Sequence, residues 1–106
     1  MSDRAATQII RTDGTRLALV DNFSFRDLQE AVNGYVEFVS LADGWVLALN
    51  EDGRPLGLAP NRAATEDARS RGLPGDYALV GDVVLLSPED YSRVMEVEEV
   101  EECPII

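Results

Sequence analysis

The sequence contains no histidine and no lysine, and Cys103 is its only cysteine. Histidine changes charge near neutral pH and is the commonest imidazole ligand of zinc, so its absence excludes many catalytic and metal-binding mechanisms. A single cysteine cannot form a disulfide within the chain, and Cys103 lies in a polar segment without a motif that would make it reactive. We therefore expect a cytoplasmic protein.

Long hydrophobic runs are also missing. The first ten residues, MSDRAATQII, lack the apolar core of a signal peptide. Nowhere does the chain approach the ~18 consecutive apolar residues that a membrane-spanning helix needs. The sequence thus predicts a soluble protein that is neither exported nor inserted in a membrane.

Positive charge is scarce. The 106 residues include nine arginines and twenty acidic residues, which gives a net charge of -11. Such a field repels nucleic acid and anionic lipid, so we expect no direct binding to either. The apolar content of 45% is ordinary, which predicts one folded domain at 1–95 followed by an acidic tail at 96–106.

The side-chain sets that catalysis usually requires are absent as well. We find no Ser-His-Asp or Cys-His set, no phosphate-binding GxxxxGK[ST] motif and no spaced cysteines. Glu37 lies in an otherwise apolar strand, but a solvated carboxylate is the commoner interpretation. Trp45 opens an apolar run and is expected to be a core or rim aromatic. The sequence therefore predicts no enzyme, no catalytic residue, no metal site and no cofactor.

The sequence does contain three turn-forming Asp-Gly pairs, at 13–14, 43–44 and 52–53. Asp-Gly readily takes the positive φ angles of a type I′ hairpin turn. The expected strands are 7–12, 15–20, 35–41, 45–50, 55–58 and 76–87, with a bulge at Gly81-Asp82 in the last. Strand 45–50 is apolar throughout, which suits a strand covered on both faces. The predicted fold is α+β, with a small antiparallel meander of about five to six strands and two short capped helices.

Both helices are predicted from their starts. Ser24 can cap a helix while Asp27 returns a bond to the cap, and Gly34 can take the left-handed conformation that ends it. Ser87 and Asp90 repeat the same capping box before the C-terminal segment.

The segment NEDGRPLGLAPNRA, residues 50–63, is the best candidate for a site. Residues 61–75 predict a short helix that buries little, and Asn61 can cap it. The free N–H groups at such a start, together with the guanidinium of Arg62, would form a small anion pocket able to hold a phosphate. In the alternative, Asn61 is only a cap and Arg62 only pairs with a carboxylate such as Glu66.

Three blocks of the chain resemble a known family. The blocks LQEAVNGYVEFV, LNEDGRPLGLAPNRA and GDYALVGDVVLL, within residues 17–87, are similar to small domains of unknown function found in phages, plasmids and bacteria. The resemblance implies a compact α+β domain without known catalysis. Some phage proteins of similar architecture are counter-defence sponges that sequester cyclic ADP-ribose-like signals. A relation to them would make Arg54, Asn61 and Arg62 the candidate ligand contacts.

Two functions follow as hypotheses. The first is a binding protein that captures a small anionic nucleotide without altering it, using arginines because the rest of the molecule repels anions. Self-association is expected with it, because a short meander leaves strand edges open. The second is an acidic module whose EVEEVEE run, 96–102, imitates nucleic-acid charge and blocks a basic protein surface.

Overall fold

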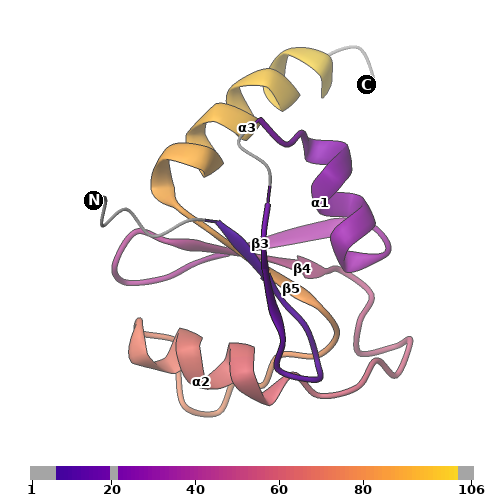
Figure 1. The fold of residues 1–106 in the computed structure, drawn as a ribbon, viewed down its shortest axis with the longest axis vertical. Coiled ribbons are helices and arrows are strands. Elements are labelled where there is room, and N and C mark those ends of the chain that lie inside the picture. Colours follow the sequence, from indigo (N-terminus) through magenta and orange to yellow (C-terminus); the bar gives the residue numbers. More distant parts are fainter. Residues whose placement is uncertain (1–6, 20–21, 103–106) are drawn as a thin grey trace.

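The computed structural model describes residues 7–19 and 22–102, which form a sheet with helices on both faces (Figure 1). The strands are β1 (Gln8–Ile10), β2 (Arg16–Ala18), β3 (Val36–Ser40), β4 (Val46–Asn50) and β5 (Val83–Leu86). The helices are α1 (Phe25–Val32), α2 (Arg62–Ser70) and α3 (Pro88–Glu102). The predicted α+β class is confirmed.

The strands lie in the order β2-β1-β5-β4-β3, and all neighbouring pairs are antiparallel. The antiparallel sheet is therefore as predicted, but it is not a simple meander. β5, the last strand in the sequence, lies between β1 and β4 and joins the two hairpins. The centre of the sheet thus depends on contacts between the two ends of the chain.

Different helices cover the two faces of the sheet, with α1 and α3 on one and α2 on the other (Figure 1). Successive side chains of a strand point to opposite faces. In β4, Val46 and Ala48 accordingly pack with α1 and α3, whereas Leu47 and Leu49 pack with α2. All five residues of β4 are buried, as predicted for a strand covered on both faces.

The first two Asp-Gly pairs do make hairpin turns, but not of type I′. Gly14 and Gly44 have φ angles of 91° and 93°, whereas Asp13 and Asp43 do not have positive φ. Each aspartate instead accepts a hydrogen bond from the N–H two residues further on. This is the three-residue loop in which a type I turn is followed by a left-handed glycine.

The third Asp-Gly pair is not followed by the predicted strand. Residues 51–57 form consecutive turns, in which Leu56 N–H donates to the Asp52 carbonyl and Leu58 N–H to the Gly53 carbonyl. A strand at 55–58 would have to pair with β4, but β3 and β5 already occupy both edges of β4. Pro60 instead forms an isolated bridge with Val80, in the loop before β5.

The predicted capping box of α1 is confirmed. Ser24 Oγ accepts from Asp27 N–H at 3.3 Å, and the Asp27 carboxylate accepts from Ser24 N–H at 2.8 Å. The helix ends at Asn33, with a φ of 65°, rather than at Gly34 as predicted. Gly34 serves a close approach instead, because a Cβ there would lie 2.9 Å from Nδ2 of Asn50.

The capping box of α3 is only half as predicted. Ser87 Oγ accepts from Asp90 N–H at 3.2 Å, but the Asp90 carboxylate does not return a bond to Ser87. It accepts the Thr7 hydroxyl at 2.6 Å, and Thr7 Oγ1 accepts Ser87 N–H at 3.0 Å. The start of the described chain is thereby tied to α3, whose helical backbone continues into the segment 96–106.

α2 buries more than the sequence predicts. Ala64, Thr65 and Ala68 are buried against the sheet, since small side chains let the helix approach closely. Ala64, Ala68 and Leu73 from the segment 61–75 belong to the hydrophobic core between α2 and the sheet, which we name the α2 core.

Asp67 connects the outer surface of α2 to the sheet. Its carboxylate lies 2.8 Å from Nη1 of Arg16 in β2 and 2.9 Å from Nε of Arg71. Arg71 also contacts Asp43 at 2.8 Å and lies over the ring of Trp45, at the rim of the α2 core. Burial alone would raise the pKa of Asp67, but the hydrogen bonds from Arg16 and Arg71 outweigh it and hold the pKa below its ordinary value of 3.8.

We expect Asp67→Asn to lower the free energy of unfolding at pH 7 by on the order of 1 kcal/mol, because the ion pairs are partly exposed. A carboxylate with a lowered pKa stabilises the fold above its unfolded pKa, and that contribution is lost as the pH falls through the folded pKa. Urea denaturation should therefore show the difference from wild type shrinking between about pH 5 and pH 2. Asp76→Asn, at an exposed aspartate, is the control. An equal difference at both ends of that range would contradict this account.

Candidate functional site

Asn61 lies fully buried at the start of α2. Its Oδ1 accepts the N–H of Ala64 at 3.0 Å, which confirms the predicted N-cap. Its Nδ2 donates to the carbonyls of Ile10 and Gly81, at 2.8 Å each. The amide therefore joins α2, the end of β1 and the approach to β5.

These bonds use both hydrogens of the Asn61 amide. A ligand could contact this amide as a donor only by breaking one of them. Of the three residues predicted to contact a ligand, Asn61 thus has a structural role that positions the next residue, Arg62.

Arg62 borders a hollow of about 250 Å³, which we name the Arg62 hollow. α2 supplies Arg62, Glu66 and Arg69, and Ala78 and Leu79 form part of the opposite wall. The guanidinium of Arg62 is exposed and has no hydrogen bond or ion pair with the described residues, so the alternative pairing with Glu66 is not formed. Arg69 donates one hydrogen bond, to the carbonyl of Gly75 at 2.8 Å.

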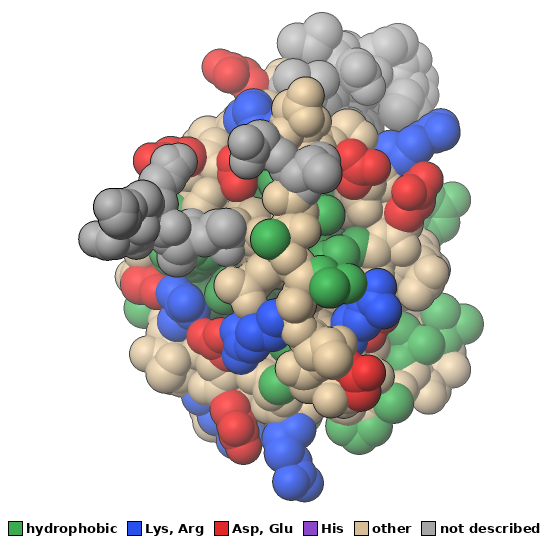
Figure 2. All heavy atoms as spheres, in the orientation of Figure 1, with side chains coloured by type: hydrophobic (Ala, Val, Ile, Leu, Met, Phe, Trp, Pro, Cys, Tyr) green, Lys and Arg blue, Asp and Glu red, His purple; other side chains and the backbone are tan. Residues whose placement is uncertain are grey.

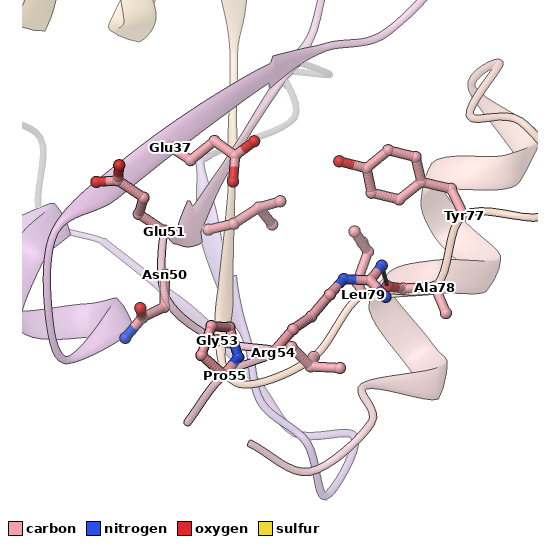
Figure 3. A pocket seen from close by; sticks show the side chains of 11 residues that line it. Glu37, Asn50, Glu51, Gly53, Arg54, Pro55, Tyr77, Ala78 and Leu79 are labelled. Atoms are coloured by element: carbon pink, nitrogen blue, oxygen red, sulfur yellow. Dashed lines mark hydrogen bonds between the residues drawn. The ribbon is translucent and has the colours of Figure 1, made fainter. Parts of the chain in front are cut away.

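Arg54 borders a second hollow of about 200 Å³, which we name the Arg54 hollow (Figure 3). Its guanidinium donates to the Ala78 carbonyl at 2.8 Å and lies 6.0 Å from the centre of the Tyr77 ring. Glu37 and Glu51 also line this hollow. In Figure 3 the Glu37 carboxylate points across the hollow toward the Tyr77 hydroxyl, whereas the Glu51 carboxylate points away.

The structure brings Arg54 and Arg62 to adjacent hollows rather than to one. Ala78 and Leu79 line both, so this dipeptide forms the wall between them. Carboxylates lie in both hollows, and Figure 2 likewise shows arginines next to acidic side chains on the face that it presents. Positive charge is therefore local and not a broad patch.

Sequence reasoning missed Arg69 and Tyr77. Arg69 follows Arg62 by seven residues, which places both on one side of a helix. Since the sequence predicts a helix over 61–75, this spacing could have identified Arg69. No local signal identifies Tyr77, because its place beside Arg54 depends on how the loop before β5 returns to the sheet.

The described residues hold no group of three or more cysteine or acidic side chains arranged to bind a metal ion. Among those same residues, the helices are too short or too polar to cross a membrane.

We expect Asn61→Ala to destabilise the fold by roughly 3 kcal/mol, because it removes a helix cap and the side-chain hydrogen bonds to the carbonyls of Ile10 and Gly81. Urea denaturation measures the loss, and Asn22→Ala, at an exposed position, should change the unfolding free energy by less than about 0.5 kcal/mol. A cost for Asn61→Ala no larger than that of the control would refute the structural role of this amide.

Comparison with known proteins gives a family but no function. No curated protein and no solved structure matches the chain. The family model described as a domain of unknown function (DUF3846) matches residues 7–102, which is nearly the whole sequence. The match extends beyond the resemblance found in residues 17–87. The protein therefore belongs to the DUF3846 family of domains of unknown function.

Proposed function

We propose that this domain binds a small anionic nucleotide in the cytoplasm and holds its phosphate in the Arg62 hollow. The observation that carries the proposal is the guanidinium of Arg62, which is exposed beside a hollow and unpaired among the described residues. Other arginines are already engaged: Arg16 and Arg71 in ion pairs, and Arg93 with the Phe23 carbonyl. Arg62 is thus available for an anion from outside.

The start of α2 adds backbone donors beside this guanidinium. The N–H groups of Arg62 and Ala63 precede the first intrahelical hydrogen bond and have no acceptor among the described residues. Asn61 fixes their direction by capping the N–H of Ala64. N–H groups at a helix start and a nearby guanidinium together suit a phosphate, and Arg69 adds a second positive charge across Glu66.

The proposed role is capture without conversion, as in a counter-defence sponge of a phage or plasmid. Thr65 carries the only hydroxyl among the side chains lining the Arg62 hollow. This hydroxyl already donates to the Asn61 carbonyl at 2.8 Å, and its oxygen accepts the Leu79 N–H at 3.0 Å. A hydroxyl held in this way is poorly placed to attack a ligand, which supports binding alone.

A second candidate, an acidic module that blocks a basic protein surface, is favoured by one feature of α3. This single helix continues through Glu102 and so carries the run 96–102 on a regular backbone. Deletion of residues 96–106 separates the two candidates, because it should abolish binding to a basic protein and leave nucleotide binding unchanged.

The test of the first candidate is Arg62→Ala, titrated by calorimetry with pyrophosphate and with nucleoside diphosphates. Removing a charged, bidentate contact should weaken binding at least about tenfold. Arg26→Ala is the matched control, since Arg26 is also exposed and unpaired among the described residues but lies on α1, beyond the opposite face of the sheet. Mass spectrometry should recover the bound nucleotide intact. Equal affinities of Arg62→Ala and wild type, at equal stability, would rule out the Arg62 hollow as the phosphate site.

A further inference from the structure

We propose that the Arg54 hollow binds the base of the same nucleotide, and that Glu37 makes it select guanine. This inference rests on the proposed function, since Arg62 would hold the phosphate in the adjacent hollow. Glu37, Arg54 and Tyr77 line the Arg54 hollow from three different parts of the chain (Figure 3).

Opposite charges line this hollow without pairing. Glu37 is exposed on β3, and its carboxylate makes no hydrogen bond or ion pair with any described residue. Arg54, the cation in the same hollow, bonds to the Ala78 carbonyl instead. The Tyr77 hydroxyl, toward which Glu37 points, also has no partner among the described residues. Charged and polar groups are therefore left for a ligand.

The size of the hollows indicates how a nucleotide would be divided between them. Pockets for whole drug-sized ligands are typically about 300 to 1,000 Å³. The Arg54 and Arg62 hollows are smaller, at about 200 and 250 Å³. Because Ala78 and Leu79 line both, a ligand that crosses this wall would place its phosphates at Arg62 and its base at Arg54.

The chemistry of Glu37 selects among the bases. An ionised carboxylate only accepts hydrogen bonds, and its two oxygens can accept two parallel ones. Guanine has two adjacent donors, the ring N1–H and the 2-amino group. Adenine and cytosine place a ring nitrogen acceptor beside their amino group, and uracil flanks its N–H with two carbonyls, so each would direct an acceptor at the carboxylate.

The rest of the hollow suits the remainder of a guanine. Arg54 uses Nη2 in its bond to Ala78, and the other guanidinium N–H groups can donate to O6 and N7. The partly buried Tyr77 ring offers a stacking face for the base. Glu51 also borders the hollow but points away from it, and it serves as an internal control.

The test is calorimetric titration of the full chain with pyrophosphate, GDP, ADP and IDP, the last of which lacks the 2-amino group. We expect GDP to bind at least about tenfold more tightly than the other three, because one lost hydrogen bond to a charged group costs about that factor. Glu37→Gln should remove the preference for GDP and leave the affinity for pyrophosphate unchanged. Glu51→Gln should keep both. Circular dichroism verifies that both variants fold.

The outcomes separate this inference from the proposed function. If pyrophosphate binds in an Arg62-dependent manner but GDP binds no more tightly than IDP, the guanine site is refuted and the phosphate site stands. A preference for GDP that survives Glu37→Gln also refutes the guanine site. If none of the four probes binds, both proposals are refuted.

Discussion

The buried amide of Asn61 holds three segments of the fold together. One side chain satisfies the start of α2 and two backbone carbonyls, one from β1 and one from the approach to β5. A buried polar group is costly unless all of its hydrogen bonds are made, so the three segments can pack only in the arrangement that makes them. The position of Arg62, the next residue, follows directly from this constraint.

Most of the positive charge that the structure describes in detail is engaged in contacts within the fold. Twenty acidic residues surround nine arginines, and several of those arginines hold the fold together. Arg16 and Arg71 join α2 to the sheet through Asp67, and Arg93 bonds the backbone before α1. An arginine that remains unpaired beside a hollow therefore stands out. Since a net charge of -11 repels anions at a distance, any anion would have to be held by close contacts.

Local signals in the sequence predicted local structure well. The capping box of Ser24 and Asp27 and the apolar strand 45–50 were readable because all of the necessary groups lie within a few residues. Two of the errors, the strand at 55–58 and the capping box of α3, have the opposite cause. The strand expected at 55–58 is excluded by β5, which arrives 25 residues later to occupy the edge of β4. Likewise, the partner of Asp90 is Thr7, from the other end of the chain.

In the candidate site, too, the sequence predicted local features and not the contacts between distant segments. Arg54 and Arg62 were identified from the segment 50–63, and both do border hollows. That these are two hollows, separated by Ala78 and Leu79, depends on the return of the loop before β5 and has no local signature. The role of Asn61 was half predicted, since its cap is local and its bonds to Ile10 and Gly81 are not.

If the two hollows beside Ala78 and Leu79 form one nucleotide site, a bound nucleotide must perturb arginines of both hollows, and side-chain NMR detects this. Titration of ¹⁵N-labelled protein with GDP should shift the arginine Nε–H signals of Arg54, Arg62 and Arg69 along a single binding curve. The signals of Arg26 and Arg93, on the α1 and α3 side of the sheet, should not move. Shifts confined to Arg26 and Arg93, or different binding curves for Arg54 and Arg62, would contradict a single site.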